Sequence, residues 1–226
     1  MILKRIIAIV IGYIFGLFLS GYLLGKAKHK DITTMGSGNA GTTNTLRMFG
    51  WKAGLITLLG DILKTLLAIF VVWLLFHRSE PEGVRLLELY AGFGTILGHN
   101  FPFYMFLRKG EKKKGGKGIA CTGALMIAFC PIEVPIGLSI FIVTVILTKY
   151  VSLGSILGLI SFFIQTIVFG ELGWLDVTTA YKTEIYILAA AVMLLGIVRH
   201  HENIKRLLNG TENKFSLKKK EEGTEK

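Results

Sequence analysis

The sequence predicts an all-α integral membrane protein with seven transmembrane helices, its N-terminus outside the cell and its C-terminus in the cytoplasm. Three observations predict this class. Of the 226 residues, 52% are hydrophobic, and the mean hydropathy of +0.57 exceeds what a soluble domain of this length needs for its core. Several apolar runs approach the roughly 20 residues that a helix needs to cross a bilayer. The basic residues fall mainly on one side of the predicted bilayer.

Seven apolar runs give the predicted helices, with polar or turn-forming segments between them. The third and fourth runs are short, which suits a thinned bilayer or re-entrant neighbours. The first run is too long for the apolar part of a signal peptide, and no small-x-small cleavage site follows it, so we expect a retained helix. The predicted ranges are 5–25, 53–76, 84–98, 118–131, 134–149, 153–170 and 184–200.

The Lys and Arg residues give the orientation of these helices. When the loops alternate across seven spans, 20 of the 26 basic residues fall on one side and five on the other, with Lys64 inside a span. The richer side receives loops 26–52 and 99–117, the turn at Lys149 and the tail from Arg199. The positive-inside rule places that side in the cytoplasm. Because the basic residues form no single basic domain, we expect no nucleic-acid partner.

The first predicted cytoplasmic loop concentrates glycines, hydroxyls and amides beside a membrane helix. Its candidate residues are Gly36, Ser37, Gly38, Asn39, Gly41, Thr43, Asn44 and Arg47. Glycines let backbone N–H groups converge on an anion, and an Arg guanidinium pairs bidentately with phosphate. A plain turn between helices is the other interpretation of such a segment.

The same loop also matches G-x-G-x-x-G, with Asp61 twenty residues beyond Gly41. No strand precedes the glycines, and Asp61 lies within an apolar span, so a dinucleotide-binding fold is disfavoured. No Lys follows Gly41, which argues against a P-loop.

Three further loops on the predicted cytoplasmic side carry polar groups of similar kinds. Their candidate residues are His99, Lys114, Gly116, Lys117, Ser152, Ser155, His200 and Asn203. Taken singly, the histidines are compatible with the membrane interface, the lysines with topology signals and the serines with helix caps. Because all four loops fall on one predicted face, they can converge into one site for transfer between a lipid-like and a phosphorylated substrate.

Two charged features lie away from these loops. Asp61 and Lys64 are three residues apart on one predicted helix, a spacing that lets them pair and lowers the cost of intramembrane charge. We expect their role to be structural. Glu133, between Pro131 and Pro135, is expected to mark an external turn.

The loops resemble those of the bacterial membrane acyl-phosphate:glycerol-3-phosphate acyltransferases of the PlsY type. The first loop is similar to that family's G-S-G-N-x-G-x-T-N-x-x-R pattern at every fixed position. The resemblance covers essentially the whole chain. It continues through Asp61, Lys64, Gly98, His99, Lys114, Gly115, Gly116, Lys117, Gly118, Ser152, Leu153, Gly154, Ser155, His200, Asn203, Arg206, Gly210 and Glu212. This chain departs from the family at residues 107–113, which look like an insertion, and at Cys121, where the family usually has Thr.

The resemblance implies transfer of a fatty acyl group from acyl phosphate to the 1-hydroxyl of glycerol-3-phosphate, giving lysophosphatidic acid for phospholipid synthesis. It implies a single seven-helix acyltransferase domain over residues 1–208 and a charged, disordered cytoplasmic tail over residues 209–226. The protein is then expected in the bacterial cytoplasmic membrane, in contact with membrane lipid, with its site facing the cytoplasm. No cofactor and no metal are expected.

Residue roles follow from the resemblance as expectations. The catalytic candidates are His99, Ser37, Asn39, Arg47 and Lys114. The substrate-binding candidates are Gly36, Gly38, Gly41, Thr43, Asn44, Gly116, Lys117, Ser152, Ser155, His200 and Asn203. His99 is the first candidate for a general base or hydrogen-bond positioner and His200 the second, although a substrate phosphate can itself accept the proton.

Three rival functions remain to be compared with this one. A transporter of phosphorylated solutes also uses broken helices and cationic loops, but it needs polar groups at the midplane and on both faces. An acyl-CoA acyltransferase of the soluble type carries an H-x-x-x-x-D motif, and none of the five histidines has Asp at that spacing. A phospholipid phosphotransferase usually needs an acidic metal cluster, which the sequence lacks.

Overall fold

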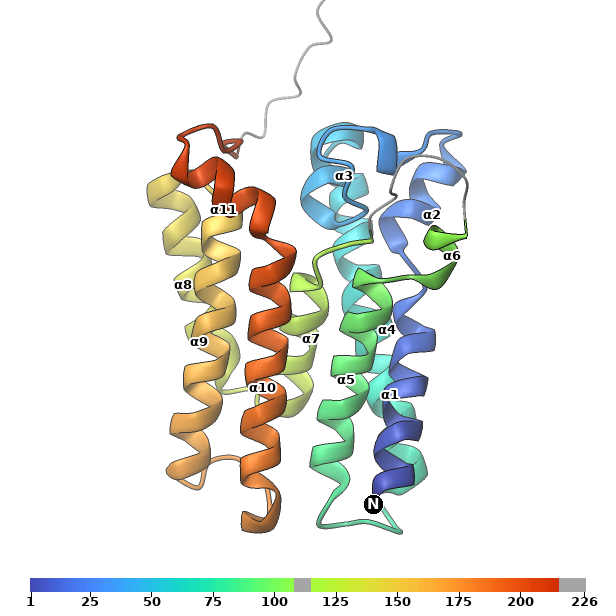
Figure 1. Cartoon of the computed structure of the whole chain (residues 1–226), viewed down its shortest axis with the longest axis vertical. Coiled ribbons are helices and arrows are strands. Elements are labelled where there is room, and N and C mark those ends of the chain that lie inside the picture. Colours follow the sequence, from blue (N-terminus) through green and yellow to red (C-terminus); the bar gives the residue numbers. More distant parts are fainter. Residues whose placement is uncertain (108–114, 216–226) are drawn as a thin grey trace, which may run out of the picture.

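In the computed structural model, which describes residues 1–107 and 115–215, the described chain folds into a bundle of roughly parallel and antiparallel helices (Figure 1). The elements are α1 (Ile2–Gly16), α2 (Ser20–Ala27), a 3-10 helix η1 (Ile32–Thr34), α3 (Thr42–Phe49), α4 (Trp51–Phe76), α5 (Val84–Asn100), α6 (Phe103–Phe106), α7 (Ile119–Phe129), α8 (Glu133–Thr148), α9 (Val151–Glu171), α10 (Thr179–Arg199) and α11 (His201–Leu208). Each of the seven predicted ranges contains a helix.

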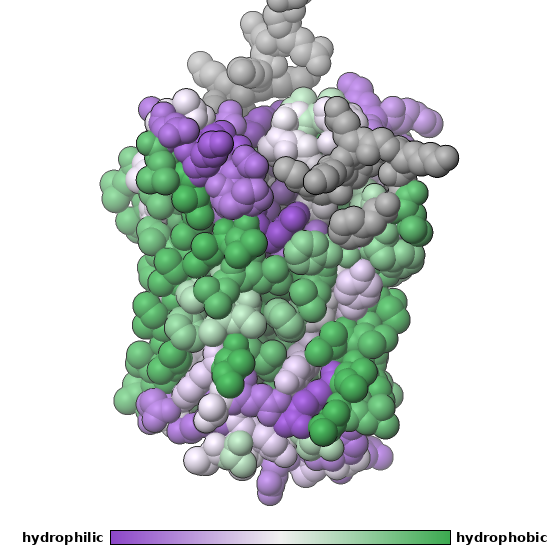
Figure 2. Space-filling model, in the orientation of Figure 1, coloured by the Kyte–Doolittle hydropathy of each residue, from purple (hydrophilic) through white to green (hydrophobic). Residues whose placement is uncertain are grey.

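The face of the bundle drawn in Figure 2 is mostly apolar across its middle and polar towards both ends. Four helical stretches of the described chain are long and apolar enough to cross a membrane: Ile2–Ala27, α4, α9 and α10. Helices α7 and α8 are apolar but shorter, and α5 has 17 residues. The described chain is therefore a helical bundle with an apolar belt, while the count of seven crossings stays a prediction.

The first predicted helix is interrupted rather than continuous. Between α1 and α2 the backbone at Leu19 is extended, with φ −81° and ψ 96°, so the carbonyls before it lose their helical partners. Side chains replace those partners: Tyr104 Oη donates to the Leu17 carbonyl at 2.8 Å, and Lys64 Nζ donates to the Phe18 carbonyl at 2.9 Å. The prediction of one helix over 5–25 is wrong at this point. The residues at the break are all apolar, so hydropathy gives no sign of it.

Helices α1 and α5 cross in close contact through glycines. Gly12 and Gly16 are four residues apart on α1, and Gly94 and Gly98 are four apart on α5. A Cβ atom added to Gly12 would lie 2.0 Å from the Ala91 carbonyl oxygen, and one added to Gly98 would lie 2.3 Å from the oxygen of Tyr13. Small residues at this spacing let membrane helices approach backbone to backbone. This crossing holds α5, and therefore His99 at its end, against the interrupted first helix.

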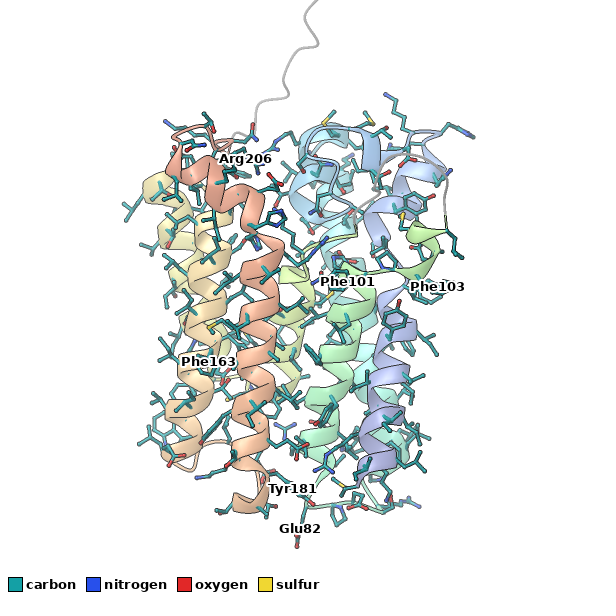
Figure 3. The ribbon with its side chains drawn as sticks, viewed as in Figure 1. Glu82, Phe101, Phe103, Phe163, Tyr181 and Arg206 are labelled. Atoms are coloured by element: carbon teal, nitrogen blue, oxygen red, sulfur yellow. The ribbon has the colours of Figure 1, made fainter. Side chains whose placement is uncertain are left out.

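Polar ends flank the apolar belt. Helices α3 and α11 lie at the end of the bundle opposite the N-terminus (Figure 1), and the apolar pattern predicted neither of them because both are short and polar. Figure 3 shows Arg206 at this end and Glu82 with Tyr181 at the other. We call the end that carries α3 and α11 the α3–α11 end.

Glu133 differs from its expected place in an external turn. It is the first residue of α8 and is fully buried, and Thr166 Oγ1 donates a hydrogen bond to its Oε1 at 3.1 Å. The turn itself occupies Pro131 and Ile132. The prolines at 131 and 135 correctly predicted a turn, but they did not indicate that the Glu133 side chain would be buried in the bundle.

Candidate active site

The first loop is a tight turn held by one buried amide. Gly36 and Gly38 adopt φ of +58° and +69°, a region that L side chains rarely enter. Asn44 Oδ1 accepts a hydrogen bond from the Ser37 backbone N–H at 3.0 Å, and its Nδ2 donates to the carbonyls of Met35 and Asn39. The Asn44 side chain thus holds the loop in shape.

Some side chains of this loop and of α3 hold the backbone in place, and others are available to a ligand. The Asn39 side chain accepts a hydrogen bond from the Gly41 N–H at 3.1 Å, and Thr43 lies in the first turn of α3. Ser37 is exposed. Arg47, in the last turn of α3, makes no hydrogen bond or ion pair with any residue of the described chain, so its guanidinium is available for a ligand.

His99 lies in the last turn of α5 and is only 3% exposed. Its Nδ1 is 2.8 Å from Lys64 Nζ. The Lys64 ammonium also pairs with Asp61 Oδ1 at 2.8 Å, and Ser20 Oγ donates to the same carboxylate oxygen at 3.1 Å. The predicted Asp61–Lys64 pair is therefore present. The sequence did not indicate that this pair directly supports a candidate catalytic residue.

The glycine–lysine loop folds over His99. The Gly116 backbone N–H donates to the His99 carbonyl at 2.9 Å, and Arg199 Nη2 donates to the Gly116 carbonyl at 3.0 Å. A Cβ atom on Gly116 would lie 1.7 Å from His99 Nε2, so only glycine fits there. Lys114, predicted to be catalytic, and residues 108–113 of the apparent insertion lie outside the described residues.

Lys117 belongs to a part-buried polar network with the C-terminal region. Its Nζ donates to Asn203 Oδ1 on α11, and Asn203 Nδ2 donates to Glu212 Oε1 at 2.8 Å. Ser152 Oγ on α9 donates to the same Glu212 oxygen at 3.0 Å, and Arg206 Nε donates to the other at 2.7 Å. Glu212 therefore connects three of the predicted site residues.

This network shifts two pKa values. Burial lowers the pKa of Lys117 to about 8, with Glu212 opposing the shift and Arg206, Arg199 and Arg47 adding to it. Burial acts to raise the pKa of Glu212, but hydrogen bonds from Asn203, Arg206 and Ser152 outweigh it and hold that pKa below its usual value. Lys117 is consequently a cation that burial has made easy to deprotonate. The field of Arg47 on Lys117 also places α3 within electrostatic reach of the network.

Ser155 and His200 make local hydrogen bonds. Ser155 Oγ donates to the Val151 carbonyl at 2.8 Å, so it neither caps α9 nor joins the network. His200, between α10 and α11, is 2% exposed, and its Nδ1 lies 2.7 Å from the Gly196 carbonyl, which can only accept. Burial lowers the pKa of His200 to about 4, with the Lys117 charge as a second cause, so the ring is neutral at pH 7.

The predicted residues thus form two groups at the α3–α11 end. Residues of the second, third and fourth loops are joined by hydrogen bonds through Gly116, Lys117 and Glu212. Residues Ser37 to Asn44 make no hydrogen bond to those loops among the described residues. The link between the two groups is electrostatic, because the charge of Arg47 on α3 acts on Lys117.

Sequence reasoning also missed Asn100. This residue follows His99, is 2% exposed, and neither its Oδ1 nor its Nδ2 has a hydrogen-bond partner within the described part of the chain. Buried polar groups are nearly always paired, so an amide with a free donor and a free acceptor is unusual. A polar residue ending a mostly apolar helix, directly after a candidate histidine, was the available signal.

Comparisons with known proteins agree with this site. A family model described as glycerol-3-phosphate acyltransferase matches residues 6–210. The glycerol-3-phosphate acyltransferase of Thermoanaerobacter pseudethanolicus is 35% identical over 214 residues, covering 94% of this chain and 96% of that protein. That of Halalkalibacterium halodurans is 38% identical over 213 residues, covering 93% and 96%.

Solved structures are similar over the same extent. The crystal structure of PlsY (YgiH), an integral membrane glycerol 3-phosphate acyltransferase, in its glycerol 3-phosphate form has a TM-score of 0.77 and 28% identity. Its lysophosphatidic acid form has a TM-score of 0.75, and each alignment covers 94% of this chain and 96% of the other. These matches favour the acyltransferase over the transporter. The chain belongs to the PlsY family of integral membrane glycerol-3-phosphate acyltransferases.

Proposed function

We propose that this glycerol-3-phosphate acyltransferase takes its acyl group from acyl phosphate and works at the α3–α11 end, facing the cytoplasm. The lysophosphatidic acid product follows from the family; the donor and the sidedness are the proposed parts. One observation carries the proposal: the charge of Arg47, whose guanidinium has no partner among the described residues, acts on the half-buried Lys117, beside glycine backbone that contacts His99. Two such cations suit two phosphorylated substrates.

The chemistry needs positioning more than a nucleophilic side chain. Acyl phosphate is a mixed anhydride, so the 1-hydroxyl of glycerol-3-phosphate attacks its carbonyl carbon directly. The new C–O bond forms as the bond from the carbonyl carbon to the phosphate oxygen breaks, inorganic phosphate leaves, and a phosphate oxygen takes up the hydroxyl proton. Holding both substrates and stabilising the developing oxyanion supplies the rate enhancement.

Roles for the site residues follow from this scheme. Arg47 and Lys117, with Lys114, hold phosphate groups, and the backbone around Gly36, Gly38 and Gly41 presents N–H groups to the same anions. Ser37 supplies an exposed hydroxyl. Asn39 and Asn44 act mainly by keeping the first loop in its turn.

The other proposed residues act on the acceptor side. Asn203 and Ser152, both bound to Glu212, position Lys117 towards glycerol-3-phosphate. Gly116 lets the loop backbone lie directly against His99, where a side chain would not fit. Thr43, Ser155 and His200 complete the proposed binding residues; Ser155 and His200 are already committed to local carbonyls.

Orientation and span count belong to the same proposal. We place α1 with α2, α4, α5, α7, α8, α9 and α10 across the membrane, with the N-terminus outside. The excess of Lys and Arg in the loops at the α3–α11 end supports this placement.

The donor is tested with purified protein in detergent. Palmitoyl phosphate plus glycerol-3-phosphate should give lysophosphatidic acid and inorganic phosphate, and palmitoyl-CoA should give none. Arg47→Ala is the matched inactive control, because it removes a phosphate ligand that has no structural partner among the described residues. Product formation from palmitoyl-CoA alone would rule out the proposed donor while leaving the family intact.

A further inference from the structure

We infer that Lys64 is a positioning residue that fixes His99 as the tautomer protonated at Nε2, so that His99 donates a hydrogen bond to the substrate instead of acting as general base. This inference rests on the proposed acyl transfer and concerns the same site. It arises from the contacts below His99, where Asp61 and Lys64 on α4 meet the break between α1 and α2.

All three N–H groups of the Lys64 ammonium have acceptors. Nζ lies 2.9 Å from the Phe18 carbonyl oxygen and 2.8 Å from Asp61 Oδ1. The third contact, at 2.8 Å, is His99 Nδ1. An ammonium has three donors and no acceptor, so Nδ1 must offer its lone pair. A neutral imidazole whose Nδ1 accepts carries its proton on Nε2.

The competing arrangement, in which Nδ1 donates its proton to Asp61, does not fit the distances. Asp61 Oδ1 is 3.7 Å from Nδ1, beyond hydrogen-bond range, whereas Lys64 Nζ is 0.9 Å closer. A doubly protonated ring would place an N–H against the ammonium. Asp61 pairs with the Lys64 ammonium, and water does not compete for these contacts, since the two side chains are 6% and 1% exposed.

The Nε2–H group faces the glycine–lysine loop. The position that a Cβ of Gly116 would take is 1.7 Å from Nε2, so this edge of the ring lies against the backbone at Gly116. A donor there can stabilise negative charge that develops on the acyl carbonyl oxygen or on phosphate. The hydroxyl proton then goes to phosphate, because Nε2 has no lone pair to receive it.

His200 provides an internal reference with the opposite tautomer. Its Nδ1 lies 2.7 Å from the Gly196 carbonyl and must donate, which leaves the lone pair on Nε2. The protein therefore contains two buried histidines of opposite tautomer: Nδ1 accepts a hydrogen bond in His99 and donates one in His200. A single spectrum can distinguish them.

The first experiment is nitrogen NMR of the full chain in nanodiscs, labelled with ¹⁵N-histidine and assigned with His99→Gln and His200→Gln. His99 should show the Nε2–H pattern and His200 the Nδ1–H pattern. The double variant Asp61→Asn/Lys64→Met, which removes both buried charges together, should move His99 towards the Nδ1–H form. An Nδ1–H signal for His99 in the unmodified protein, or no change in the double variant, would overturn the inference. These readings do not depend on turnover, so they are independent of the acyl donor.

The second experiment compares two substitutions of His99 with similar size. The Gln side chain can place an amide N–H near the position of Nε2, whereas Leu has no donor. We expect His99→Gln to keep at least tenfold more kcat than His99→Leu, with similar KM for glycerol-3-phosphate in both. Equal loss of kcat in the two variants would contradict the donor role, since a required base is lost from both.

Discussion

At the scale of single residues, the charged groups of the candidate site differ in solvent exposure and in the partners that surround them. Arg47 has no hydrogen-bond or ion-pair partner among residues 1–107 and 115–215, whereas the half-buried Lys117 bonds to Asn203, and Lys64 has all its donors occupied. These three cations therefore suit different proposed roles: Arg47 to bind a ligand, Lys117 to bind in a pH-dependent way, and Lys64 to orient His99. Their environments, more than their types, separate these roles.

Gly116 gives a sharp prediction because its neighbour is so close. Gly116→Ala would place a methyl group 1.7 Å from His99 Nε2, forcing the ring or the loop to move. We expect kcat/KM to fall about 100-fold, as misplacement of about 1 Å commonly costs that much. Gly123→Ala on α7 is the matched control, since nothing lies within 4 Å of its added methyl group. Equal activity of the two variants, measured with acyl phosphate as donor, would contradict the proposed place of His99.

Lys117 predicts an alkaline limit to substrate binding. Its pKa, lowered by burial to about 8, leaves the ammonium charged below pH 8 and increasingly neutral above it. KM for glycerol-3-phosphate should therefore rise about tenfold between pH 8 and pH 9.5, measured at saturating donor. Lys117→Arg keeps its charge over this range and should show a nearly flat KM. The same rise in the Arg variant would assign the alkaline limit to another group.

At the scale of helices, hydropathy correctly predicted where helices lie in the sequence, but it did not predict the break in the first one. Every predicted apolar range contains a helix, because burial in lipid demands long apolar runs with internal hydrogen bonds. The break after Gly16 was missed because Leu17, Phe18 and Leu19 are as apolar as any helix interior. The carbonyls that it frees are satisfied by Lys64 and Tyr104, residues distant in sequence.

The candidate site was likewise predictable from the sequence only in part. Residue types in the loops predicted phosphate-binding chemistry, because glycine backbone together with Arg and Lys suits anions, and this role stays a prediction. The contact of Lys64 with His99 was not predictable, because it depends on the crossing of α4 with α5 and on the helix break. The unpaired amide of Asn100 and the connecting role of Glu212 likewise depend on packing that the linear pattern does not contain.

The glycine crossing of α1 and α5 predicts a stability difference between two glycines. A methyl group on Gly94 would lie 2.3 Å from the Ile9 carbonyl oxygen, so Gly94→Ala must push the helices apart. Overpacking of this kind costs about 1–3 kcal/mol, or about 5 °C in Tm. Gly158→Ala on α9 has open space around the added methyl group and should leave Tm unchanged. Thermal unfolding in one detergent compares the two, and a matching loss of Tm in both would exclude the crossing as the cause.

At the scale of the whole molecule, the two polar ends are chemically different. The network of Lys117, Asn203 and Glu212 lies at the α3–α11 end, and the pairs Lys4–Glu80 and Arg5–Glu184 lie near the N-terminus. In these two pairs a carboxylate neutralises the cation, which makes Lys4 and Arg5 less able to bind an anionic substrate. This contrast supports the proposed ligand site at the α3–α11 end.

Sidedness can be tested by labelling. The native cysteines Cys121 and Cys130 are buried, so single exposed cysteines can be added with little background. A membrane-impermeant maleimide should label Glu82→Cys on intact cells and Asn209→Cys only after permeabilisation. Equal labelling of both positions on intact cells, or the reverse pattern, would contradict the proposed orientation.

The break in the first helix also has a consequence for biogenesis. A chain that enters the membrane from its N-terminus inserts residues 2–27 before α4, so the Phe18 carbonyl initially lacks the Lys64 ammonium. In lipid an unsatisfied carbonyl costs several kcal/mol, which favours an unbroken helix at that stage. Docking of α4 would then open the helix at Leu17–Leu19. The contacts of Lys64 with the Phe18 carbonyl and with His99 would then form only when the inserted helices associate.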